Sequence, residues 1–391
     1  MFFSLRLLTA GESHGPALTG IIEGIPAGLS INTEMINRQL ARRQMGYGRG
    51  RRMQIEQDQA EILSGVRHGI TLGSPIALKI LNRDWENWQQ KMSIGIPENP
   101  IFQVTIPRPG HADLAGIQKY GFQDIRNVLE RASARETTIR VALGAICRQL
   151  LHQLDIQVAS RIVSIHQVCD EDPIQEDLSL TEINDLADAS PVRCINSQAT
   201  AGMMKAIDTA TESGDTLGGV FEILASGLPV GLGSYTHFDR KLNTRLSAAV
   251  MSINGIKGVE IGAGFAAATQ SGGQVMDEIF AEGGTITRSS NNAGGIEGGM
   301  SNGELLRMRA AMKPIPTLRK SLQSVDLTTL KPHSAHKERS DVCAAPAAAV
   351  IAEHMVCIVL ADAVLEKYSG DSMKELLAHF DMDRQTNFPR K

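Results

Sequence analysis

Two histidines sit in tight turns, where an imidazole could exchange a proton with a ligand. His14 lies in GESHGP (11–16), and His111 lies in PRPGHAD (107–113) beside Arg108. Glycine lets a polar loop bend closely, proline restrains it, and imidazole titrates near neutral pH. General acid–base chemistry is therefore one interpretation. A plain turn with a surface histidine is favoured for the first motif taken alone, and a structural turn has even odds for the second.

Arginines crowd the stretch from residue 38 to residue 52. They are Arg38, Arg42, Arg43, Arg49, Arg51 and Arg52. The planar guanidinium group donates two parallel hydrogen bonds, which suits carboxylate and phosphate. A solvated charged face or a nucleic-acid patch would also explain the run. Gly46 and Gly48 favour a loop that folds over an anion, because a solvated face would be served better by a continuous helix.

The segment ERASARE (130–136) predicts the start of a helix. Ser133 and Glu136 fit a capping box. Arg131 and Arg135 lie at the same positive helix end, where cations are disfavoured. An anionic partner bound at this helix end would resolve that conflict.

Further loop segments in the C-terminal half add cations and a carboxylate. A glycine-rich run covers residues 289–303, KPIPT begins at Lys313, and RSD joins Arg339 to Asp341. Lys313 and Arg339 could fix anions, and Asp341 could accept a proton or orient a neighbour. Each segment alone is also explained as ordinary loop chemistry.

The elements that must position these residues mix helix and strand, which indicates an α+β fold. Aliphatic runs predict strands at 18–22 and 76–81, and residues 214–303 read as strand and loop broken by glycines. Helices are predicted at 33–43 with Thr33 as cap, from Ser133 onward, and at 346–367. In the second helix, apolar residues recur at Ile139, Leu143, Ile146, Leu150 and Leu154. The polar tail after about residue 381 is expected to be disordered.

Composition excludes several classes. The 391 residues carry a net charge of −4, which argues against nucleic-acid binding, and 42% are apolar, as in ordinary globular proteins. Five scattered cysteines form no metal or disulfide pattern. Charges interrupt both the apolar N-terminus and the 344–365 stretch, so neither a signal peptide nor a membrane span is expected. A soluble, cytoplasmic protein without metal is the resulting expectation.

Taken together, these segments resemble the chorismate synthase family. The matching blocks are GESHGPALTGIIEGIPAG, RRQMGYGRGRRM, PRPGHADLAGIQKYG, ERASARETT, GGVFEILASGLPVGLGS, NNAGGIEGGMSNG, MKPIPTL and ERSD, in the family's order from residue 10 to about 350. The resemblance implies a βαβ sandwich in a homotetramer. It also implies one domain over residues 1–391, where length alone suggests about two or three.

The resemblance further implies a carbon–oxygen lyase at the last step of the shikimate pathway. The reaction is the anti-1,4-elimination of phosphate from 5-enolpyruvylshikimate 3-phosphate, which gives chorismate. Reduced FMN (FMNH2) is required without net redox change, because the flavin lends electron density and recovers it. NADPH is a candidate reductant, and dependence on an external flavin reductase is favoured over self-reduction.

Site roles follow by resemblance, position by position. The catalytic group would be His111, which protonates the leaving phosphate, His14, which protonates or stabilises the reduced flavin, and Asp341, which assists proton movement near flavin N5. Flavin-binding positions would be Arg131, Ala132, Ser133, Asn254, Gly255, Gly298, Lys313, Pro314, Ile315, Pro316, Thr317 and Arg339. Substrate and NADP positions would be Ser13, Arg43, Arg49, Arg52, Arg108 and Arg135.

Three positions depart from the family's pattern. Ala132 stands where serine is common, Ile106 where histidine is frequent, and Gly255 where alanine is common. None removes a titrating group, so we expect them to affect affinity more than activity. Two other function classes remain open: a flavin-dependent oxidoreductase that consumes NADPH, and a nucleic-acid-binding module built on the arginines from 38 to 52.

Overall fold

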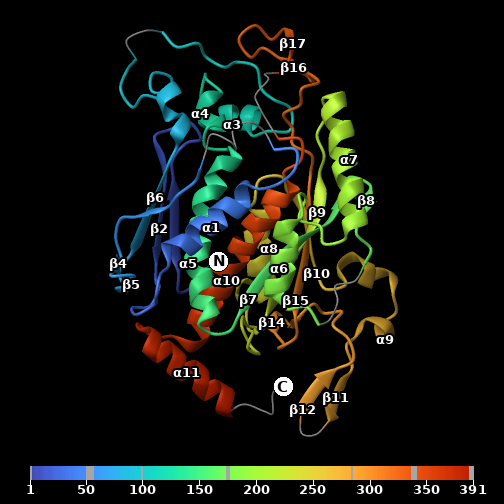
Figure 1. The fold of residues 1–391 in the computed structure, drawn as a ribbon. Helices are drawn as coiled ribbons and strands as arrows, with labels where there is room; N and C mark the ends of the chain where they lie inside the picture. The colour runs from blue at the N-terminus through green and yellow to red at the C-terminus, as the bar shows by residue number, and fades with distance from the viewer. Residues whose placement is uncertain are drawn as a thin grey trace.

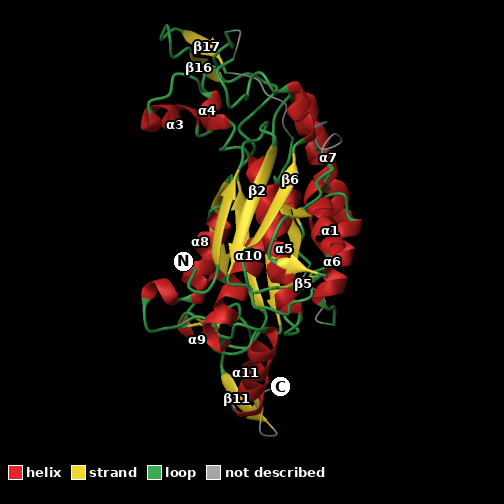
Figure 2. Cartoon of the chain, turned by 90° about the vertical axis from the view of Figure 1, so that its left-hand side faces the viewer, coloured by secondary structure: helices red, strands yellow, loops and turns green. Residues whose placement is uncertain are grey.

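Two antiparallel sheets enclose a layer of helices in the computed structural model, which describes residues 2–49, 57–97, 100–172, 177–282, 285–335 and 341–386 (Figures 1 and 2). The first sheet has the order β1 (Arg6–Ala10), β2 (Ala17–Glu23), β6 (Ile76–Leu81) and β3 (Glu61–Ile62). The second has the order β10 (Ile256–Ile261), β15 (Leu306–Met312), β9 (Gly219–Ser226), β7 (Gln157–Ile165) and β8 (Val168–Cys169). In the first sheet β2 and β6 bury alternate residues, as strands with one covered side do, whereas β7 and β9 of the second sheet are buried almost continuously.

The helices between the sheets are α1 (Thr33–Gln44), α5 (Thr137–His152), α8 (Leu242–Met251) and α10 (Ala345–Tyr368). Helix α5 packs against β2 and β6, α10 packs against β7 and β9, and the two helices pack against each other. The expected βαβ sandwich of α+β class is therefore confirmed. The other helices are α3 (Asp113–Tyr120), α4 (Arg126–Leu129), α6 (Leu180–Ala189), α7 (Ser197–Ser213), α9 (Gly272–Val275) and α11 (Met373–Thr386). Two-stranded ribbons pair β4 (Val66–Arg67) with β5 (Ile70–Thr71), β11 (Ile279–Glu282) with β12 (Thr285–Arg288), β13 (Ile296–Glu297) with β14 (Met300–Ser301), and β16 (Gln323–Val325) with β17 (Pro332–Ser334).

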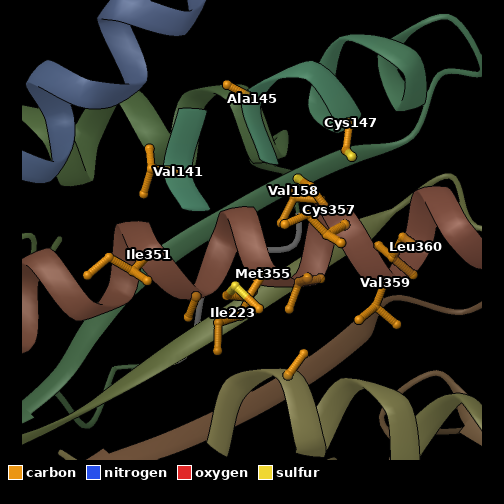
Figure 3. Packing of buried hydrophobic residues seen from close by; sticks show 14 of the residues in the cluster. Val141, Ala145, Cys147, Val158, Ile223, Ile351, Met355, Cys357, Val359 and Leu360 are labelled. Carbon is orange, nitrogen blue, oxygen red and sulfur yellow. The ribbon is translucent and has the colours of Figure 1, made fainter. Parts of the chain in front are cut away.

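Two glycines allow the layers to approach closely. A Cβ atom on Gly20 in β2 would lie 2.7 Å from a side-chain carbon of Ile139 in α5. A Cβ atom on Gly144 in α5 would lie 2.5 Å from the Cβ atom of His354 in α10. The neighbouring contacts between α5, α10 and the second sheet are made by buried apolar side chains, as Figure 3 shows for Val141, Ala145, Ile351 and Met355. Close packing of this kind makes even one added methyl group unfavourable.

A buried cluster of charges ties three of these elements together. The Glu353 carboxylate on α10 accepts hydrogen bonds from Arg42 on α1 (2.8 and 3.0 Å), from Arg148 on α5 (2.8 Å) and from Arg193 (3.3 Å). Burial alone would raise the pKa of Glu353, but the three guanidinium charges hold it well below its usual range. The carboxylate is therefore ionised, and replacing one partner would leave a buried charge uncompensated.

Most of the predicted strands and helices are present, and the differences lie at their ends. The strands expected at 18–22 and 76–81 form β2 and β6, and the apolar helical positions from Ile139 to Leu154 are all buried. Helix α1 is capped by Asn32, whose side chain accepts from the Met35 amide, so the prediction of Thr33 as cap was one residue late. Either residue type can cap a helix, which leaves the choice to backbone geometry.

The capping box expected at Ser133 and Glu136 is wrong. Ser133 caps only a 3-10 turn (Ala134–Glu136), where its hydroxyl accepts from the Arg135 amide, and α5 begins at Thr137. The Glu136 carboxylate does not return to the Ser133 amide. It accepts instead from Thr9 and Arg140, because β1 and α5 offer it partners that sequence spacing does not reveal.

Two further expectations need correction. The stretch 214–303 is not only strand and loop, because it contains α8, whose buried face packs against α10 and β10. The tail after Asp381 continues as helix α11 to Thr386, so the prediction of disorder is wrong for 381–386. Residues 387–391 lie outside the described part of the chain.

Helix α10 is the one described helix that is long and apolar enough to cross a membrane by length and composition. Its most apolar window is wholly buried inside the protein. A core helix between two sheets meets the same test, because both of its faces contact apolar partners. The helix is thus explained by the sandwich itself.

Protein stability should depend on pH through His354. Burial, only partly offset by the Glu353 charge, lowers its pKa to about 3 from a usual 6.5. Below pH 6.5 the unfolded chain binds a proton that the native state refuses, so stability is lost as pH falls toward the folded pKa. Between pH 7 and pH 5, we expect the free energy of unfolding of His354→Gln to fall by about 2 kcal/mol less than that of wild type. Urea unfolding at both pH values measures this, and identical losses in the two proteins would contradict it.

Candidate functional site

Loops at one end of the sandwich line a cavity of about 490 Å³. The loops follow β1, precede α3, join α4 to α5, join α8 to β10, and continue past β15 (Figure 1). Predicted site residues that line it are Ser13, His14, Arg43, Arg49, Arg108, His111, Ala132, Ser133, Arg135, Asn254, Gly255, Lys313, Pro314, Ile315, Pro316, Thr317 and Asp341. Residues distant in sequence thus meet around one space.

Four predicted positions do not line the cavity or cannot be placed. Arg131 donates to the carbonyls of Gly11 and Thr9 and supports the loop that carries Ser13 and His14. Gly298 lies in the tight turn between β13 and β14 and is not part of the cavity wall. Arg52 and Arg339 lie outside the described residues.

Arg43 is the most unusual cation in the cavity wall. It is 4% exposed, and it donates to the Ala134 carbonyl (2.8 Å) and to Thr137 Oγ1. Its Nη1 is buried and has no hydrogen-bond partner within the described part of the chain. Burial and the charges of Arg49 and Arg135 lower the pKa of Arg43 to about 9, and Asp58 offsets them only in part. Arg43 stays charged at neutral pH, and an anion in the cavity would relieve the imbalance.

Other cavity arginines have partners within the protein. Arg135 donates to Asp58 (2.6 Å) and to Asn82 (2.9 Å), all three being buried. The anionic partner expected at this helix start is, for Arg135, a carboxylate of the protein itself. Asp58 is distant in sequence, so spacing around the helix start does not reveal it. Asp58 Oδ2 has no hydrogen-bond partner among the described residues.

The described arginines of the run from 38 to 52 lie in three different environments. Arg38 is exposed near Asp185, Arg42 belongs to the buried Glu353 cluster, and Arg43 and Arg49 line the cavity. Helix geometry points adjacent residues in different directions, so one sequence cluster serves several purposes. Because Arg42 and Arg43 are buried, the described part of the run, up to Arg49, does not form a continuous face for nucleic acid.

His111 is held firmly in its turn. Its Nε2 lies 3.1 Å from Thr317 Oγ1, and Lys313 Nζ donates to the neighbouring Gly110 carbonyl (2.6 Å). Gly110 has a φ of 78°, a conformation that suits glycine. Burial and then the Arg108 charge lower the pKa of His111 to about 4. The ring is therefore neutral at pH 7 in the ligand-free protein.

His14, in the motif at residues 11–16, is also held in one orientation. Its Nδ1 is 2.9 Å from Oε2 of Glu130, and its ring stacks on Trp88 with centroids 3.9 Å apart. Ser13 beside it contacts the Ser133 hydroxyl (3.1 Å). Both predicted acid–base histidines thus line the same cavity in fixed orientations.

Asp341 and Arg108 contribute paired charges to the wall. Asp341 forms an ion pair with Arg49 at 2.9 Å. Arg108 binds Asp113 through Nε (2.8 Å) and Nη2 (2.9 Å), and this pair braces the turn before His111. The orienting role considered for Asp341 is compatible with this pairing.

The departures from the family's pattern can now be placed. The Ala132 carbonyl accepts from Asn254 Nδ2 (3.0 Å), so the backbone at this position is used although the side chain is small. Gly255 has a φ of 86°, which an alanine would adopt only with strain. Ile106 is half-buried and does not line the cavity.

A second cationic group faces the same cavity. Lys313 and Lys257 both line it, and burial followed by the Lys257 charge lowers the pKa of Lys313. The two ammonium groups repel each other, as the Arg43 cluster does on its side. The wall between them includes the apolar side chains of Met312, Pro314 and Ile315. The cavity can therefore accept two anionic groups joined or separated by apolar surface.

Sequence reasoning missed several residues of this site. Asp58 and Lys257 stand alone in the sequence, and no motif marks them. Glu130 lies inside ERASARE, where attention to capping hid its carboxylate, and Trp88 lies in a segment without a motif. A scarce tryptophan in a chain with 4% aromatic residues was the one available signal.

Comparison with known proteins gives consistent matches over the chain. A family model described as Chorismate synthase matches residues 5–365. A chorismate synthase of Desulforudis audaxviator is 56% identical over 376 residues, covering 95% of each protein. One of Pelobacter propionicus is 55% identical over 386 residues, covering 96% of this chain and 97% of that one.

A solved structure titled "Crystal Structure of Chorismate Synthase" matches with a TM-score of 0.80 and 43% identity. It covers 98% of this chain and 99% of its own. Sequence blocks, fold and cavity residues agree over the same span, so the chain belongs to the chorismate synthase family.

Proposed function

We propose that the cavity binds 5-enolpyruvylshikimate 3-phosphate together with reduced FMN and is where the chain forms chorismate. As a chorismate synthase, the chain is a carbon–oxygen lyase of the last shikimate-pathway step. The observation that carries the proposal is the buried, incompletely paired Arg43 in a cavity with a second cationic group at Lys257 and Lys313. The substrate has one phosphate and two carboxylates, and FMN has another phosphate, so the site must accept four anionic groups carried by two ligands.

The residues present fit a flavin. The apolar side chains of Met312, Pro314 and Ile315 suit a flat ring system, and Asn254 and Lys313 beside them can bind polar edges or phosphate. Reduced FMN, when bound, supplies transient electron density to the breaking carbon–oxygen bond. By resemblance, Arg131 to Ser133, Gly298 and Arg339 remain proposed flavin-binding positions. Gly298 is not part of this cavity wall, so it would have to contact the flavin from outside it.

The substrate would lie toward the arginines. Arg43, Arg49 and Arg135 orient its anionic groups, and Arg52 and Arg108 are proposed to assist. His111, neutral in the ligand-free protein, must gain a proton before it can donate one to the departing phosphate. An anion bound beside it raises the pKa of the ring, so substrate binding itself would charge the acid.

The remaining roles are proposals of the same kind. His14 would donate or hold a proton at the flavin, and Asp341, oriented by Arg49, would assist proton movement near N5. We further propose a cytoplasmic homotetramer that receives reduced flavin from an external reductase, with NADPH as the source of electrons. Substrate-dependent NADPH consumption by the purified protein alone would favour the oxidoreductase alternative.

The function is tested with purified protein, chemically reduced FMN and 5-enolpyruvylshikimate 3-phosphate under anaerobic conditions. We expect chorismate absorbance and released phosphate to rise in equal amounts, and neither to rise with oxidised FMN alone. The elimination yields one of each product without net oxidation. Silence from folded, flavin-binding protein would refute the proposed activity.

The two histidines should each be needed for turnover. We expect His14→Ala and His111→Ala to slow turnover by roughly 10²–10⁴-fold, the usual contribution of a general acid. Stopped-flow chorismate formation measures this, and circular dichroism checks folding. Near-normal turnover in either variant would reject the role of that histidine.

Arg43 should matter for substrate affinity more than for folding. We expect Arg43→Gln to raise the Kd for 5-enolpyruvylshikimate 3-phosphate about 10- to 100-fold, because a charged hydrogen bond is lost. The stability of the ligand-free protein should change little, because the substitution also removes an incompletely paired buried charge. Isothermal titration and thermal unfolding measure the two effects.

Arg38→Gln is the matched control, since Arg38 lies on the same helix with an exposed side chain. It should leave the Kd as in wild type. Equal affinity losses in both variants would show that helix charge in general, and not Arg43, attracts the substrate.

A further inference from the structure

Glu130 makes an unusually complete set of contacts with His14. The His14 amide donates to Glu130 Oε2 (2.9 Å), and Nδ1 of the ring lies 2.9 and 3.0 Å from the two carboxylate oxygens. The Ser13 amide donates to the Glu130 carbonyl (3.0 Å). The Glu130 side chain is 1% exposed. A buried carboxylate at the end of α4 therefore holds both the backbone and the ring of His14.

The charge of Glu130 decides which ring nitrogen carries hydrogen. Burial would raise the pKa of Glu130, but the hydrogen bonds and charge of His14, and then the Arg126 charge, hold it below its usual range. Arg126 Nη1 donates to Glu130 Oε1 at 2.9 Å. An ionised carboxylate can only accept, so Nδ1 of His14 must be the donor. The neutral ring then has Nε2 unprotonated.

A stacked indole fixes the plane of the same ring. The rings of His14 and Trp88 are 3.9 Å apart and inclined by 21°. Asp84 Oδ2 accepts from Trp88 Nε1 (3.1 Å) and so secures the indole. Arg126 and Lys91 lie over the same indole. Two separate segments, 84–91 and 126–130, thus define one position for the ring.

The other ring nitrogen is left for exchange. Nε2 of His14 is 4.0 Å from Asp84 Oδ2, beyond hydrogen-bond range, and makes no hydrogen bond within the described ranges. His14 lines the cavity, although its side chain is only 9% exposed. A ring with one nitrogen fixed and one unengaged can transfer a proton only at the second.

We propose that Glu130 is a positioning residue of the active site, which fixes the Nδ1–H tautomer of His14 and leaves Nε2 as its proton-exchanging atom. The proposal deepens the proposed function and rests on it for the catalytic role of His14. The tautomer itself rests only on contacts in the ligand-free protein. Glu130 touches neither substrate nor flavin in this role, since it acts through His14.

The test is Glu130→Gln, which keeps the shape of the side chain and removes its charge. The amide group must then turn its donor toward either His14 or Arg126, both of which are donors. We expect nitrogen NMR of histidine-labelled, ligand-free protein to show the Nδ1–H pattern for His14 in wild type and a mixture of tautomers in the variant. The His14→Gln variant assigns the signals.

The kinetic readout accompanies the spectrum. We expect kcat to fall by about 10²-fold with little change in KM, because a misplaced proton-exchanging nitrogen slows chemistry without removing a substrate contact. Glu222→Gln is the matched control, since Glu222 is also buried and pairs with Arg161 and Arg307 outside the cavity. It should leave both the His14 signals and kcat close to wild type.

Unchanged His14 signals in folded Glu130→Gln protein would overturn the proposal, and so would altered signals with full kcat. If Glu130→Gln fails to fold, Glu130→Asp is read in the same way, because it keeps the charge but withdraws it from the ring. Full turnover in His14→Ala would refute the proposed role of His14, while the NMR result would still decide whether Glu130 sets the tautomer. The two failures are therefore distinguishable.

Discussion

The ion cluster around Glu353 is the constraint on which the rest of the molecule depends. Its carboxylate is fully buried between helices and accepts from Arg42, Arg148 and Arg193, which come from three different parts of the chain. A buried charge of this kind is unfavourable unless every partner is in place. The cluster therefore does not merely add stability. It specifies one arrangement of α1, α5 and α10 between the two sheets.

Two adjacent residues of α1 connect the ion cluster to the cavity. Arg42 points into the cluster, and Arg43, the next residue on α1, lines the cavity. The other side of the same wall starts at the beginning of α5, where Thr137 binds Arg43. Because α1 and α5 are locked by the cluster and by close packing at Gly144, the position of Arg43 is set by the interior of the protein.

Like charges lie close together around the cavity, and their repulsion destabilises the ligand-free protein. Burial and then the charges of Arg49 and Arg135 lower the pKa of Arg43, and burial followed by the Lys257 charge lowers the pKa of Lys313. Repulsion of this sort persists in a folded protein when rigid surroundings hold the charges in place. Anionic ligands relieve it, so binding energy is stored as unfavourable charge in the ligand-free protein. His14 differs in this respect, since Glu130 and Trp88 hold its ring in place before any ligand arrives.

The family, the main strands and helices, and most of the residues around the cavity could be predicted from the amino-acid sequence. Motif blocks preserve chemistry in order along the chain, and periodic apolar residues mark α5 and α10 whatever their partners. The sequence misjudged the capping box at Ser133 and the tail after Asp381. In the first case, Glu136 found a partner on β1 that local spacing cannot show.

Which charged side chains are exposed, paired or incompletely paired depends on the tertiary structure. Six arginines in one short stretch look alike in the sequence, yet Arg38 is exposed, Arg42 is neutralised and Arg43 is left incompletely paired. Asp58, Lys257 and Glu130 belong to no recognisable motif for cation or histidine binding. Their roles depend on contacts between distant segments, and an electrostatic interaction depends on distance and burial in space, which residue order does not contain.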